Sequence, residues 1–114
     1  MVEELYHCTH YITKFGNEYG SFNLECYSDD INAFILTALY VREEHREQGH
    51  GNELLKDAED IARACNKSIL LKVEQGTFME DWYKRNGYRL HSDEDEYVWL
   101  IKDIYNDKGI ERIH

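Results

Sequence analysis

Three consecutive segments decide the fold of this chain: an apolar run, INAFILTALYV (residues 31–41), a polar run, REEHREQ (42–48), and a glycine turn, GHG (49–51). The apolar run is rich in branched and aromatic residues, which favour strands. Because almost no polar residue interrupts it, we expect a strand that is buried on both faces in the middle of a sheet. The abrupt change to polar residues and glycine then marks where this strand ends.

An amphipathic helix follows the glycine turn. Its apolar positions are separated by steps of three and four residues, which places them on one helical stripe: Leu54, Leu55, Ala58, Ile61, Ala62 and Cys65. A second short apolar run covers Ser68 to Val73. Residues 31–73 therefore predict strand, helix and strand, a unit that is normally parallel and right-handed. We expect Cys65 to lie in the core.

The remaining segments complete a mixed sheet. Residues 22–27 alternate as an exposed strand, whereas the first 20 residues leave their structure open. Residues 77–86 predict a second helix with Thr77 as its cap, Glu80 in a capping box and Gly87 at its end. Residues 88–90 and 97–101 predict a hairpin around an acidic turn. At 114 residues, we expect one α/β (α+β) domain over residues 1–114.

Composition restricts the partners. The chain has 23 acidic and 13 basic side chains and a formal net charge of −10, so we expect cationic partners and no nucleic acid. No apolar run approaches the roughly 20 residues of a membrane span, and residues 1–4 lack the basic start of a signal peptide. The three cysteines and six histidines show no metal-ligand spacing. We therefore expect a cytoplasmic protein with no membrane association and no metal.

The glycine turn is a candidate anion site. It lies where a strand passes into a helix N-terminus, whose first amides have no partner within the helix. Glycines allow an anion to approach this backbone, and phosphate or pyrophosphate is the natural ligand. The turn matches neither a P-loop nor GxGxxG. A plain tight turn is the alternative interpretation.

These residues resemble the GCN5-related N-acetyltransferase (GNAT) family. Val41, then Arg46-x-x-Gly49-x-Gly51, is similar to its acyl-CoA signature, and Trp82-Tyr83 followed by Gly87-Tyr88 is similar to a second landmark. The resemblance covers residues 31–101. Glu43 stands where the signature usually has proline, Thr77 stands where an asparagine is common, and the N-terminal segment is short for the family.

The resemblance implies a GNAT-like mixed sheet and an acetyl-CoA-dependent N-acetyltransferase. Acetyl-CoA would be the co-substrate. The acceptor would be the primary amine of a small molecule or a peptide, which we expect to be cationic, and it would attack the carbonyl of acetyl-CoA directly. Tyr83 would be the catalytic acid or sulfur anchor. The cofactor-binding residues implied by the resemblance are Leu39, Val41, Arg46, Glu47, Gln48, Gly49, His50, Gly51, Asn52, Thr77 and Tyr83.

The sequence leaves open the identity of the general base and whether the fold retains catalysis. The general base could be Glu43, Glu44, Glu74, His45 or a water molecule. The fold could also serve as an acyl-CoA-binding or protein-binding module with reduced catalysis. A homodimer through a sheet edge is a further option.

Overall fold

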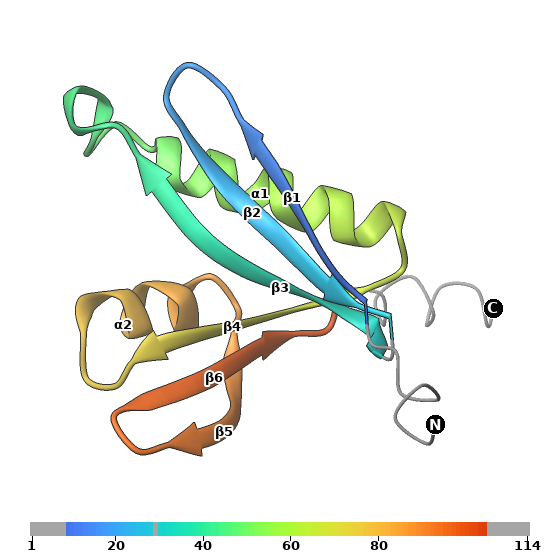
Figure 1. The fold of residues 1–114 in the computed structure, drawn as a ribbon. Coiled ribbons are helices and arrows are strands. Elements are labelled where there is room, and N and C mark those ends of the chain that lie inside the picture. Colours follow the sequence, from blue (N-terminus) through green and yellow to red (C-terminus); the bar gives the residue numbers. More distant parts are fainter. Residues whose placement is uncertain (1–8, 29, 105–114) are drawn as a thin grey trace, which may run out of the picture.

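The computed structural model describes residues 9–28 and 30–104, which form a six-stranded mixed sheet with two helices (Figure 1). The strand order is β1-β2-β3-β4-β6-β5, and β3 and β4 are parallel while all other neighbours are antiparallel. This confirms the expected mixed sheet and its parallel strand-helix-strand unit. The elements are β1 (His10–Gly16), β2 (Gly20–Tyr27), β3 (Asp30–Val41), the one-turn 3-10 helix η2 (Glu43–His45), α1 (His50–Ala64), β4 (Ser68–Glu74), α2 (Phe78–Arg85), β5 (Arg89–Glu94) and β6 (Tyr97–Lys102).

Helix α1 covers one face of the β1–β3 half of the sheet. Four residues of its stripe are buried and Ile61 is partly buried, and they pack in one core cluster with Phe22, Leu24 and Leu36 of the strands; the four are Leu54, Leu55, Ala58 and Ala62. Full burial of each such leucine or phenylalanine stabilises the fold by about 1.5–3 kcal/mol. The prediction for Cys65 is wrong: α1 ends at Ala64, and Cys65 is an exposed C-cap residue that no longer follows the helical stripe. Cys8 lies outside the described residues.

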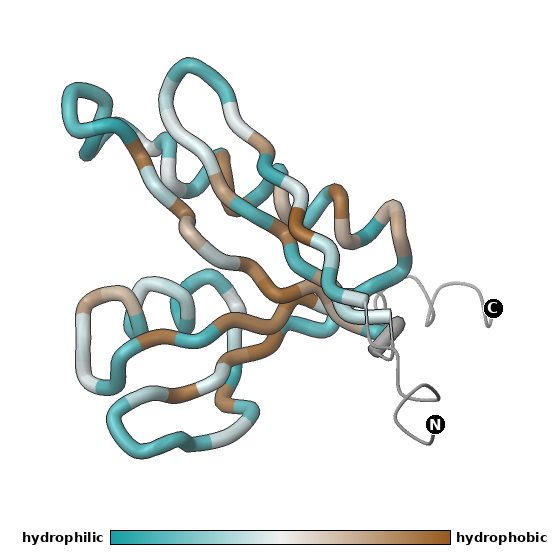
Figure 2. Tube along the Cα trace, in the orientation of Figure 1, coloured by the Kyte–Doolittle hydropathy of each residue, from teal (hydrophilic) through white to brown (hydrophobic). Residues whose placement is uncertain are grey.

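Strand β3 is less buried than its sequence predicts. Leu36 is buried, but Ala38 and Tyr40 are exposed. The reason is that α1 packs against only one face of β1–β3, so the other face has no covering helix among the described residues. Hydrophobic residues concentrate where β3 and β4 run together, and hydrophilic residues follow at η2 (Figure 2).

The two parallel strands separate after a short contact. They pair only at Ala33–Ser68, Phe34–Ile69 and Ile35–Leu70. Beyond Ile35, β3 pairs with β2 alone and β4 with β6 alone, and the two strands diverge (Figure 1). Ala38 has a positive φ of 55°, an uncommon conformation that accompanies a register shift between β2 and β3. This local irregularity bends β3 away from its parallel neighbour.

Helix α2 begins at its predicted cap. The Thr77 hydroxyl accepts a hydrogen bond from the Glu80 amide (3.4 Å) and donates one to the Glu74 carbonyl (2.7 Å). The Glu80 carboxylate accepts from the Gly76 amide (2.6 Å), one residue earlier than in a standard capping box. Gly87, with a φ of 97°, ends the helix.

The predicted C-terminal hairpin is present, but its strands are longer than expected. β5 extends through the acidic residues to Glu94, which leaves only two residues in the turn. Every residue of β5 is exposed, so acidic side chains can occupy an edge strand without burial. Of the helices in residues 9–28 and 30–104, none is long and apolar enough to span a bilayer.

Candidate active site

The glycine turn leaves the start of α1 without a cap. Gly49 is the N-cap residue, and no side chain accepts a hydrogen bond from the first turn. Glu53 is the first residue of α1 whose amide has a backbone acceptor: it donates to the Gly49 carbonyl (3.2 Å). The preceding amides of His50, Gly51 and Asn52 therefore lie at the positive end of the helix with no partner in its ladder.

Glycine at position 49 is required by backbone conformation. Its φ of 87° is left-handed, which costs about 1–2 kcal/mol for a residue with a β-carbon. A β-carbon there would have no neighbour within 4 Å, so space is not the constraint. At Gly51, a β-carbon would be 3.7 Å from the Trp82 ring, an ordinary contact.

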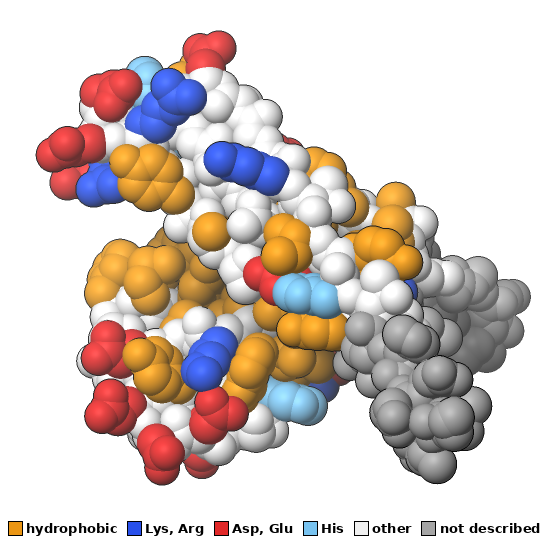
Figure 3. All heavy atoms as spheres, viewed as in Figure 1, with side chains coloured by type: hydrophobic (Ala, Val, Ile, Leu, Met, Phe, Trp, Pro, Cys, Tyr) orange, Lys and Arg blue, Asp and Glu red, His pale blue; other side chains and the backbone are white. Residues whose placement is uncertain are grey.

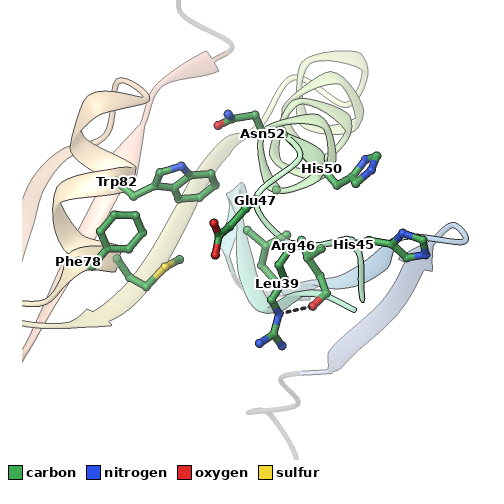
Figure 4. Close-up of a pocket in the computed structure, with 12 residues that line it drawn as sticks. Leu39, His45, Arg46, Glu47, His50, Asn52, Phe78 and Trp82 are labelled. Carbon is green, nitrogen blue, oxygen red and sulfur yellow. Dashed lines mark hydrogen bonds between the residues drawn. The ribbon is translucent and has the colours of Figure 1, made fainter. Parts of the chain in front are cut away.

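A cavity of about 420 Å³, here called the first cavity, lies between the glycine turn and α2. Trp82 and Phe78 of α2 face Glu47 across it, whereas the rings of His45 and His50 point away from α2 (Figure 4). The space-filling view shows hydrophobic side chains gathered around the hollow between the two halves of the sheet (Figure 3). The cavity thus combines amide donors at one end with an apolar wall formed by Leu39, Val41, Phe78, Met79 and Trp82.

Most residues predicted to bind the cofactor come together in the first cavity. They are Leu39, Val41, Arg46, Glu47, Gly49, His50, Gly51 and Asn52. Gln48 belongs to the turn but does not line the cavity. Thr77 lines neither this cavity nor the one described below, because it caps α2.

Two side chains of the turn are held by the protein itself. Arg46 Nε donates to the Val41 carbonyl (2.9 Å), and its guanidinium lies 5.2 Å from the centre of the Tyr40 ring. The His50 ring stacks on Tyr19 with 3.7 Å between ring centres, and its Nδ1 is 2.8 Å from Glu53. The main chain of the turn, more than these side chains, is therefore available to a ligand.

A second cavity of about 350 Å³ lies where β3 and β4 diverge. Leu39 lines both cavities, so they approach each other at β3. Tyr83 of α2 lines the second cavity and is 5% exposed. Burial raises the pKa of Tyr83 to about 12, so the phenol remains protonated at neutral pH and can donate a proton.

The positions of the candidate general-base residues show which of them line a cavity. Glu43, Glu44 and Glu74 are exposed and line neither cavity, and His45 lines only the first. The acidic residue that lines the second cavity is Glu25 of β2.

The sequence analysis missed Glu25 because residues 22–27 showed only an alternation of polar and apolar residues. Glu25 reaches the second cavity because β2 pairs with the bent strand β3. It also missed Phe78 and Met79 of the apolar wall. The signal in the sequence was a pair of adjacent apolar residues at the start of a predicted helix, and both side chains are exposed in the structure. Within the described part of the chain, no three His, Cys, Asp or Glu residues are grouped as metal ligands.

The family assignment follows from a sequence comparison. The family described as acetyltransferase (GNAT) domain matches residues 6–90. This match covers well over half of the 114 residues, and the chain belongs to the GNAT acetyltransferase family. A search of curated proteins finds no significant match.

Solved structures share the fold. The PaiA N-acetyltransferase of Thermoplasma acidophilum, in complex with coenzyme A, is 22% identical with a TM-score of 0.64, and the match covers 75% of this chain and 53% of that one. An acetyltransferase from Bacillus cereus is 26% identical with a TM-score of 0.62, covering 83% and 73%. A GNAT family acetyltransferase from Elizabethkingia anophelis, with acetyl-CoA bound, is 20% identical with a TM-score of 0.63, covering 82% and 74%. The matched part of this chain thus spans about half the length of the Thermoplasma protein.

Proposed function

We propose that this protein is an N-acetyltransferase that moves the acetyl group of acetyl-CoA to a primary amine. The observation that carries the proposal is the uncapped start of α1, whose free amides lie at one end of an apolar cavity. Family membership supports the same conclusion, as do the fold neighbours from Thermoplasma acidophilum and Elizabethkingia anophelis that hold coenzyme A or acetyl-CoA. The free thiols of Cys26 and Cys65 fit a reducing cytoplasm.

The residues of the first cavity suit the parts of acetyl-CoA. The amides of residues 50–52 would bind the pyrophosphate. β3 loses its β4 partner after Ile35, so the main-chain groups of Leu39 to Val41 on that side can pair with the pantetheine arm. Phe78, Met79 and Trp82 would contact the apolar parts of the arm.

The chemistry proposed for the site needs no covalent enzyme intermediate. An alkylammonium ion has a pKa near 10, so the acceptor must lose a proton before it reacts. Its nitrogen then attacks the thioester carbon and forms the C–N bond, the attached nitrogen loses a second proton to solvent, and the C–S bond breaks. Main-chain amides of β3 would stabilise the charge that develops on the carbonyl oxygen. The Tyr83 hydroxyl would give its proton to the departing sulfur and regain one from solvent.

The two tryptophans allow the proposal to be tested site by site. Trp82 lines the first cavity and Trp99 the second, and the chain has no other tryptophan. In ¹⁵N-labelled protein, coenzyme A should move the indole N–H signal of Trp82, which the variant Trp82→Phe identifies. Acetyl-CoA and a panel of primary amines should then release free thiol. An unmoved Trp82 signal at millimolar coenzyme A would refute the proposal, whereas binding without turnover would support the non-catalytic acyl-CoA-binding module.

A further inference from the structure

Glu25 is the acidic residue of the second cavity, and two neighbours fix its orientation. The Thr37 hydroxyl of β3 donates to Oε2 (2.6 Å), and His10 Nε2 of β1 lies 2.8 Å from Oε1. The His10 ring is itself stacked on Tyr27, with ring centres 4.3 Å apart. The Glu25 side chain is 18% exposed, so its carboxylate is held in one place at the cavity wall.

The carboxylate retains capacity for a further donor. An ionised carboxylate offers about four lone-pair positions, and the two contacts above use two of them. Lys72 also lines the cavity, but its ammonium is 2.8 Å from Glu94 and lies over the Tyr97 ring. Among the described residues, the cation that can contact Glu25 is His10, which is charged only when protonated; with His10 neutral, the negative charge of Glu25 is available to a cation that enters the cavity.

The lining of the second cavity combines polar groups with aromatic and aliphatic side chains. Its volume of about 350 Å³ is at the lower end of the range for small-molecule sites. A fixed carboxylate beside aromatic and aliphatic side chains matches an ammonium group on an alkyl chain. The apolar side chains of the wall are Tyr27, Ile35, Leu36, Leu39, Leu71, Tyr83 and Trp99.

We infer that Glu25 binds the ammonium group of the acceptor and thereby selects primary alkylamines, an inference that rests on the proposed acetyl transfer. The carboxylate holds the nitrogen in the second cavity, and the aromatic side chains of the wall contact the alkyl chain. A free alkylamine and the side chain of a lysine in a peptide present the same chemistry. The experiment below separates these two sources.

The kinetic test is the substitution Glu25→Gln. Glutamine keeps the size of the side chain and an oxygen that can accept from Thr37, but it removes the charge. We expect the KM for butylamine or for a lysine peptide to rise about 10–100-fold, the range of a lost hydrogen bond to a charged group. The KM for acetyl-CoA should change less than twofold. Glu96→Gln, at an exposed turn position outside both cavities, is the matched control for loss of one negative charge.

A binding test follows the Trp99 indole signal, with and without coenzyme A. Butylamine or the lysine peptide should move it in the wild type and in Glu96→Gln, and the same shift in Glu25→Gln should require about 10–100-fold more amine. The compound that moves Trp99 identifies the source. An equal shift or equal KM in Glu25→Gln, or no shift with either amine, would overturn the inference. Failure of the proposed function is distinct, because it would show as an unmoved Trp82 signal with coenzyme A.

Discussion

A negative charge at position 51 should remove coenzyme A binding without unfolding the protein. The β-carbon of Gly51→Glu would make only ordinary contacts with Trp82 and Val41, and Gly51 lines the first cavity, so we expect the added carboxylate to approach the pyrophosphate position there. Two unit charges about 4 Å apart repel by about 1 kcal/mol in water and about 4 kcal/mol at a dielectric of 20. For this partly open cavity we expect a loss of about 100-fold in affinity, or about 2.7 kcal/mol.

Calorimetric titration with coenzyme A, together with thermal unfolding, measures this loss. Gly51→Ala is the matched control, because it adds the same β-carbon without charge and should bind within about threefold of the wild type. Gly49 is a poorer position, since any side chain at its φ of 87° adds backbone strain. If Gly51→Glu and Gly51→Ala bound coenzyme A equally well, the turn amides would not be the pyrophosphate site.

Three other variants probe the site and its support. Tyr83→Phe should lower kcat at least tenfold and leave the Kd of coenzyme A within twofold, and an equal loss in both would exclude a specific acid role. Because the pKa of Tyr83 is raised from 10 to about 12, its contribution to stability is complete below pH 10 and is lost as the pH rises to 12. The pKa of Tyr88 is also raised by burial, so both proteins should lose stability in urea unfolding over this range, but the loss in Tyr83→Phe should be about 2–3 kcal/mol smaller than in the wild type; identical pH slopes would contradict it. Thr77→Ala should destabilise the protein by about 1 kcal/mol, and Thr77→Ser should not, with coenzyme A affinity unchanged in both. A change in that affinity alone would mean that Thr77 contacts the cofactor.

The sequence was sufficient for the two helices, the strand-helix-strand unit and the ends of α2, whereas it left β1 open and made the strands of the hairpin too short. The apolar stripe of α1, the Thr77 cap and the closing Gly87 are encoded within a few residues, because helix periodicity and capping depend on near neighbours. The strand-helix-strand unit follows from the same patterns and the strong preference for right-handed crossovers. The glycine turn could be found because uncapped amides and a left-handed glycine are local features as well.

Only the tertiary structure decided how the two cavities form. The separation of β3 from β4 after Ile35 depends on which strands remain paired, and pairing joins residues far apart in the chain. The same long-range register brings Glu25 of β2 beside Thr37 and into the cavity that Tyr83 reaches from α2. Burial on one face of β3 instead of two also depends on which face α1 covers. Periodicity identifies the face that a residue occupies, but what lies opposite that face is determined by the packing of distant segments.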